Sequence, residues 1–95
     1  MIIIVLDEDR KDLECVKEGD VSLFWDTLSV LSDYDVVELY FINVNDETWN
    51  KLKDYDSVKL NLNEEEVREF LDKTRYGMGY VFVYRNGKIK KCLPS

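Results

Sequence analysis

The chain has 95 residues, of which 20 are Asp or Glu and 13 are Lys or Arg, so its net charge at pH 7 is −7. This length supports one core, and we expect residues 1–95 to form a single small domain. His is absent, which removes the usual general base and the commonest zinc ligand and argues against most hydrolase and zinc-enzyme mechanisms.

The first half of the chain alternates strand and helix patterns. Residues 1–6 are a continuous apolar run, typical of a strand buried on both faces, whereas the charged residues 10–20 indicate no element. Apolar residues then recur at helical spacing from Val21 to Leu31, with Asp20 or Ser22 as the N-cap. Residues 36–44 indicate a second buried strand.

The second half continues the alternation. Asn45 or Asp46 is the candidate cap of a short helix over residues 46–54. Strict alternation in residues 57–62 predicts a strand that buries one face, formed by Val58, Leu60 and Leu62. The next helix begins after Asn63, which with Glu66 forms the spacing of a capping box, and it ends at Gly77.

The C-terminal segment predicts a β-hairpin. Asn86-Gly87 lies between the stretches 80–85 and 88–93, and both residues of such a turn must adopt positive φ. The expected register pairs Tyr84 with Ile89 and Val81 with Cys92. No run of apolar residues approaches the roughly 20 needed to span a bilayer, and no basic leader precedes the first strand, so we expect neither a membrane segment nor export.

The element order β-α-β-α-β-α-β-β resembles that of the thioredoxin-like superfamily, in which a mixed sheet ends in an antiparallel hairpin. Tyr76-Gly77 followed by residues 80–89 is similar to the stretch where thioredoxins carry a Tyr-Gly, a cis-proline turn, an apolar strand and an Asn-Gly turn. The fold implied is a mixed sheet of about five strands with three helices. Residues 41–49 contain no Cys where the family has CxxC, and Pro94 is the only proline, so the resemblance implies a degenerate member without disulfide-exchange activity.

The two cysteines, Cys15 and Cys92, have neither CxxC spacing nor the spacing of metal ligands. A reducing cytoplasm is therefore the expected compartment, although the sequence leaves a disulfide between them open. The absence of Gln beside plentiful Lys and Glu favours a thermophilic source.

Carboxylates follow the predicted strands where ligands of open α/β sheets usually bind. Asp7 and Asp9 come directly after the first strand, and Asp46 follows the second. Carboxylate oxygens are ligands of Mg²⁺, so these three residues form a candidate metal site of a Mg²⁺-dependent phosphate-handling enzyme. The alternative is that these acids are solvated charges at the ends of strands.

Charge is divided along the chain. Residues 1–72 hold 20 acidic and 7 basic residues, a net −13, whereas residues 73–95 hold 6 basic residues and no acid, a net +6. Such fields attract partners of opposite sign. One candidate acidic row is Asp33, Asp35 and Glu38, and the other is Glu64, Glu65, Glu66, Glu69 and Asp72 on the last predicted helix. Candidate basic contacts are Arg85, Lys88, Lys90 and Lys91.

The function expected first is that of a non-enzymatic cytoplasmic interaction module, such as a small viral or accessory regulatory protein, without a cofactor. Its expected partner is a basic or nucleic-acid-binding protein, and the C-terminal hairpin is a candidate surface for a homodimer. Direct binding of nucleic acid is not expected, because the net charge of −13 on residues 1–72 repels a polyanion. The alternative is that the charged faces are only solvated.

Overall fold

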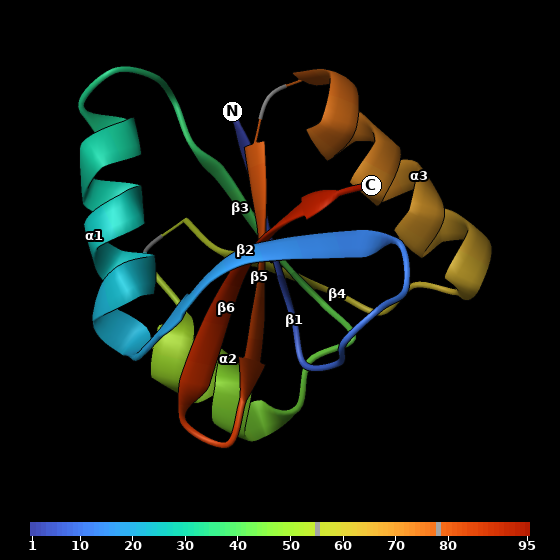
Figure 1. Cartoon of the computed structure of the whole chain (residues 1–95), viewed down its shortest axis with the longest axis horizontal. Helices are drawn as coiled ribbons and strands as arrows, with labels where there is room; N and C mark the ends of the chain where they lie inside the picture. The colour runs from blue at the N-terminus through green and yellow to red at the C-terminus, as the bar shows by residue number, and fades with distance from the viewer. Residues whose placement is uncertain (55, 78) are drawn as a thin grey trace.

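The protein folds into a mixed sheet between two layers of helix (Figure 1), as seen in a computed structural model that describes residues 1–54, 56–77 and 79–95. Met78, next to the position where thioredoxins have their cis-proline turn, lies outside the described residues. The six strands found in the described part are β1 Ile2–Leu6, β2 Leu13–Gly19, β3 Glu38–Ile42, β4 Val58–Leu60, β5 Gly79–Arg85 and β6 Lys88–Pro94. The three helices found there are α1 Val21–Ser32, α2 Asp46–Leu52 and α3 Glu64–Gly77.

The order of strands in the sheet is β2-β6-β5-β1-β3-β4. β1 is parallel to both of its neighbours, β3 and β5, and β3 is parallel to β4. β6 is antiparallel to β5 on one side and to β2 on the other. After β1 the chain forms β2 at the far edge, and then adds β3 and β4 on one side of β1. β5 and β6 follow on the other side, which makes a topological switch point between β1 and β5.

Two apolar clusters bury the sheet. On one face α1 and α2 pack against β1, β3, β5 and β6, and the rings of Phe24 and Phe82 meet edge to face at 5.2 Å between centroids. On the other face α3 packs through Val67 and Leu71. The central strands are buried on both faces, because Ile3 and its neighbours up to Val5 are 0% exposed, as the apolar sequence of β1 predicts.

Local sequence signals set the helix starts as predicted. The N-cap of α1 is Asp20, whose carboxylate accepts a hydrogen bond from the backbone N–H of Ser22 at 2.9 Å. The cap of α2 is Asn45. Asn63 and Glu66 form the capping box of α3, each side chain accepting from the other residue's backbone N–H, at 2.9 and 3.1 Å. The hairpin register is also confirmed.

The sequence missed β2. Five of its seven residues are exposed, so the strand lacks the apolar alternation that marks a half-buried strand. Its partner β6 lies at the other end of the chain, so no hairpin turn marks it either. The observed order of elements is thus β-β-α-β-α-β-α-β-β, and the thioredoxin-like relationship stays a prediction. β3 and β4 are shorter than predicted, and Val58, expected on the buried face, is 43% exposed.

Candidate functional site

Asp7, the first predicted metal ligand, is engaged in holding α2. Its two carboxylate oxygens accept hydrogen bonds from the backbone N–H of Asn45, at 2.6 Å, and from the hydroxyl of Thr48. These donors are at the N-cap and in the first turn of α2, where a negative charge is favourable. Asp7 therefore serves as a structural link between the end of β1 and the start of α2.

The other two predicted ligands are paired with basic residues. Asp9 lies 3.1 Å from Arg85 and 3.2 Å from Lys90, and the Lys90 hydrogen bond, helped by Arg85, holds the pKa of Asp9 below its usual value. Asp46 lies 3.3 Å from Lys59. Across the described residues, no group of three or more Asp, Glu or Cys is placed to hold a metal ion. Asp7, Asp9 and Asp46 each have a different partner in the described structure, and a Mg²⁺ site formed by them stays a prediction.

The basic residues of the hairpin do not form one free patch. Arg85 and Lys90 are the partners of Asp9. The ammonium of Lys91 lies 4.1 Å from the ring centroid of Tyr80, and burial lowers the pKa of Lys91. Lys88 is exposed.

The last strand of the hairpin, β6, is not an edge strand of the sheet. Because β2 pairs with the outer side of β6, the edge that the sequence offered for self-association is occupied within the same chain. Homodimerisation through that edge therefore remains a prediction that requires β2 to leave it.

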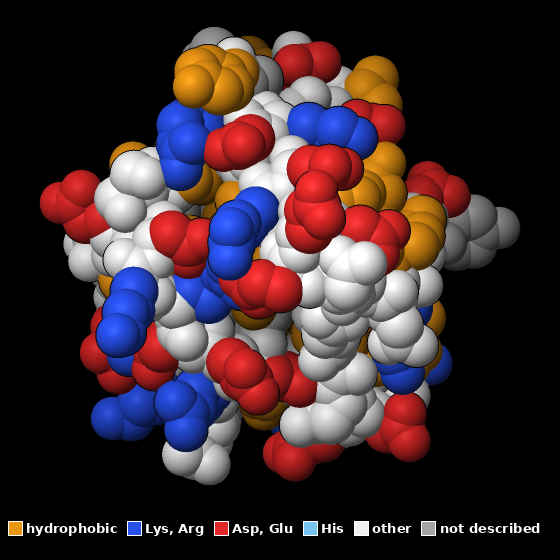
Figure 2. Space-filling view, turned by 90° about the vertical axis from the view of Figure 1, so that its right-hand side faces the viewer, with side chains coloured by type: hydrophobic (Ala, Val, Ile, Leu, Met, Phe, Trp, Pro, Cys, Tyr) orange, Lys and Arg blue, Asp and Glu red, His pale blue; other side chains and the backbone are white. Residues whose placement is uncertain are grey.

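The acidic row on α3 is partly neutralised. Glu64 lies 2.7 Å from Arg10 and 3.5 Å from Arg68, and the Arg10 hydrogen bond lowers the pKa of Glu64. Glu65 and Glu69 are exposed. On the face that α3 covers, Figure 2 shows acidic and basic side chains interspersed instead of a continuous acidic surface.

A cavity of about 550 Å³ lies on the opposite face of the sheet, beside α1. We call it the acidic-rimmed cavity. It is bounded by α1, by the start of β3 and by the loop that precedes β4, and it is lined by Trp25, Leu28, Ser29, Ser32, Asp35, Val36, Val37, Leu39, Asp54, Asp56 and Ser57.

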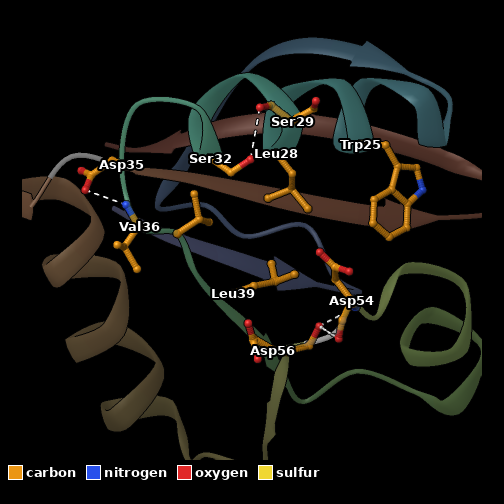
Figure 3. A pocket seen from close by; sticks show the side chains of 11 residues that line it. Trp25, Leu28, Ser29, Ser32, Asp35, Val36, Leu39, Asp54 and Asp56 are labelled. Carbon is orange, nitrogen blue, oxygen red and sulfur yellow. Dashed lines mark hydrogen bonds between the residues drawn. The ribbon is translucent and has the colours of Figure 1, made fainter.

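Apolar side chains form the floor of the acidic-rimmed cavity. Figure 3 shows Leu28 of α1 and Leu39 of β3 facing each other across it, with Trp25 at one end and Val36 at the other. Leu28 and Leu39 belong to the buried core, whereas Val36 is 78% exposed. The apolar lining of the cavity therefore extends from buried core residues to an exposed residue at the surface.

Carboxylates form the rim. Among the described lining residues three are acidic, Asp35, Asp54 and Asp56, and none is basic. Asp35 accepts from the backbone N–H of Val36 at 2.7 Å and lies 3.6 Å from the N-terminal amine of Met1. The rim thus places three carboxylates around an apolar floor, one of them beside the N-terminal amine.

Sequence reasoning named Asp35 in an acidic row but missed Asp54 and Asp56. The signal lay in a repeated triplet, because Asp-Tyr-Asp occurs at residues 33–35 and again at residues 54–56. These triplets precede β3 and β4, which are parallel neighbours and therefore begin at the same edge of the sheet. The cavity lies at this amino-terminal edge, away from the carboxyl ends where Asp7 and Asp9 lie.

Comparison of the chain with models of protein families, with curated proteins and with solved structures finds no match. None of the helices in the described part of the chain is long and apolar enough to cross a membrane.

Proposed function

We propose that this protein is a non-enzymatic interaction module that binds a basic segment of a protein partner in the acidic-rimmed cavity. The observation that carries the proposal is the combination of an apolar floor, Leu28 and Leu39, with a rim of three carboxylates. The cavity volume of about 550 Å³ falls in the range of ligand pockets and suits a few side chains of a peptide.

Lys and Arg fit such a site because each joins an aliphatic stem to a charged head. The stem packs along apolar surface while the head stays at the polar rim. In the acidic-rimmed cavity a stem would cover Leu28 and Leu39, and the charged head would meet Asp35 or Asp56. Trp25 at the end of the cavity offers an aromatic ring to a second cation.

The charge of the whole molecule supports the same class of partner. The protein has a net charge of −7, which attracts a basic segment from a distance and raises its association rate. This attraction is screened by salt, so binding should weaken as ionic strength rises.

The test is titration with two synthetic peptides, one alternating Leu and Arg and the other alternating Leu and Glu. Amide chemical shifts should change around the cavity with the Arg peptide alone and should saturate. Asp56→Asn and Asp35→Asn should each weaken binding about two- to fivefold, the range of an exposed ion pair.

The matched controls are the single substitutions Glu65→Gln and Glu69→Gln. These exposed residues lie on α3, across the sheet from the cavity, and each substitution removes one negative charge as Asp56→Asn does. Equal weakening by both sets would mean that net charge alone attracts the peptide. Shift changes confined to α3 would move the site to the row of Glu64, Glu65 and Glu69.

A further inference from the structure

The edge strand β2 is attached to the sheet with little help from the core. Its residues from Glu14 to Glu18 are all exposed, and Leu13 is the β2 residue that packs, half-buried, against the α3 side of the core. Backbone pairing with β6 is also interrupted by a bulge between Cys15 and Lys17. Burial of apolar surface therefore contributes little to holding β2.

Charged side chains that face each other across β2 and β6 do not stabilise the pairing of the two strands on balance. Lys17 lies directly opposite Lys91, and Glu18 lies opposite Lys90. The first pair is repulsive and the second is attractive. The repulsion affects the pKa of Lys91, which is lowered mainly by burial and in addition by the positive charge of Lys17.

A disulfide joins β2 to β6 covalently. Cys15 of β2 and Cys92 of β6 are opposite each other and bonded, across a separation of 77 residues in sequence. Cys15 is exposed, whereas Cys92 is 0% exposed within the apolar cluster under α3. A thiol in solvent would therefore approach the disulfide from the side of Cys15.

We propose that the Cys15–Cys92 disulfide is a thiol-sensitive latch: a dithiol reductant opens it, and β2 then detaches from β6 while the remaining sheet stays folded. In a reducing compartment a disulfide is usually transient and redox-sensing, whereas in an oxidising one this latch would stay closed. The latch goes beyond the binding of a basic segment, since β2 lies at the far edge of the sheet from β4 and the cavity loop.

The chemistry is two successive thiol–disulfide exchanges. A thiolate of the reductant attacks the sulfur of Cys15, a mixed disulfide forms, and Cys92 leaves as a thiolate that takes a proton. The second thiolate of the reductant then attacks its own sulfur in the mixed disulfide and releases Cys15, which is also protonated. The protein gains two electrons and two protons, and the reductant becomes a disulfide.

Release of β2 exposes one edge of β6. An uncovered strand edge presents unpaired N–H and C=O groups to which another strand can pair. Lys90 and Lys91 of β6, now opposite Glu18 and Lys17, would then lie on that open edge. The latch thus connects the redox state of one disulfide with the availability of a strand edge.

The test compares amide hydrogen exchange in the oxidised protein and in the protein treated with a dithiol. Exchange of those amides in residues 13–19 that pair with β6 should become at least about tenfold faster after reduction, because they lose their partners, whereas the alternate amides already face the open edge. In β6 only alternate amides should respond, since β5 still pairs with the others. Amides of β1, β3 and β5 should keep their protection. Trypsin should cut after Lys17 faster in the reduced protein.

The control is Cys15→Ser with Cys92→Ala, which should resemble the reduced protein and give the same exchange with and without the dithiol. The experiment on the wild-type protein stands even if this variant does not fold. Unchanged protection of β2 after complete reduction, shown by two titratable thiols, would overturn the proposal. Loss of protection throughout the sheet would overturn it as well, because the disulfide would then stabilise the whole fold and not one strand.

Discussion

The carboxylate of Asp7, directly after β1, accepts a hydrogen bond from the hydroxyl of Thr48, which is 1% exposed in the first turn of α2. The two residues are 41 positions apart, so this bond fixes where α2 docks at the end of the sheet. A buried hydroxyl needs such a partner, because an unsatisfied one costs about 1–3 kcal/mol.

We expect Asp7→Asn to lower the free energy of unfolding by about 1–3 kcal/mol. Asp7 accepts one hydrogen bond with each carboxylate oxygen, whereas Asn has a single acceptor oxygen and an NH2 group that can only donate. Urea unfolding measures this loss. The control, Asp46→Asn, removes an exposed ion pair with Lys59 and should change stability by less than about 1 kcal/mol. Mg²⁺ should not raise the melting temperature of the wild type; a rise that Asp7→Asn abolishes would restore the metal site.

Gly79 is required where β5 passes β1. A Cβ at this position would lie 2.0 Å from the carbonyl oxygen of Ile2, a backbone atom that cannot move without disturbing the pairing of the two strands. Gly79→Ala should therefore destabilise the protein by at least about 1–3 kcal/mol, the usual cost of overpacking. In Gly19→Ala the new Cβ would make an ordinary contact of 3.6 Å with Leu23. Equal thermal denaturation curves for both variants would contradict the close approach.

Local signals in the sequence predicted the parts of the fold that depend on local physics. Asn63 with Glu66 and the turn at Asn86 each meet their partners within four residues, so their patterns are visible in a short window. β2 was missed because its stabilising partners lie far along the chain. The sulfur of Cys15 bonds to Cys92, and the backbone of β2 pairs with β6. Strand order depends on such distant pairs.

The candidate site was predicted less well than the fold for the same reason. Asp7 and Asp9 were expected to share a metal because both follow β1, yet each found a different partner from a distant element. The acidic-rimmed cavity combines residues of α1, β3 and the loop before β4. Its recognition requires knowing that β3 and β4 are parallel neighbours, which no local pattern reveals.

Acid should weaken the protein through its paired carboxylates, among them Asp9 and Asp12. Lys90 lowers the pKa of Asp9, and Arg10 lowers the pKa of Asp12, from an ordinary value of 3.8. A carboxylate with a lower pKa in the folded state stabilises the fold above the unfolded-state pKa, and the contribution disappears as pH falls through the folded value. The urea midpoint should therefore be nearly constant from about pH 7 to pH 5 and should fall below about pH 4.

Substitution measures the share of that loss that comes from Asp9 and from Asp12. Asp9→Asn and Asp12→Asn should each lower stability at neutral pH by less than about 1 kcal/mol, because both side chains are partly exposed. Below pH 4 the difference from the wild type should shrink. A difference that stays constant with pH would show that these carboxylates do not titrate in this range.

The pair Lys17 and Lys91 offers a way to strengthen the β2–β6 contact without touching the disulfide. In Lys17→Glu a carboxylate would face the ammonium of Lys91, so repulsion becomes attraction and the protein should gain about 0.2–1 kcal/mol. For a domain of this size that gain corresponds to a rise in melting temperature of up to several degrees. Lys11→Glu makes the same change of charge at an exposed residue just before β2 and should not stabilise an already acidic protein. Equal melting temperatures for the two variants would mean that the lysines do not repel each other across the strands.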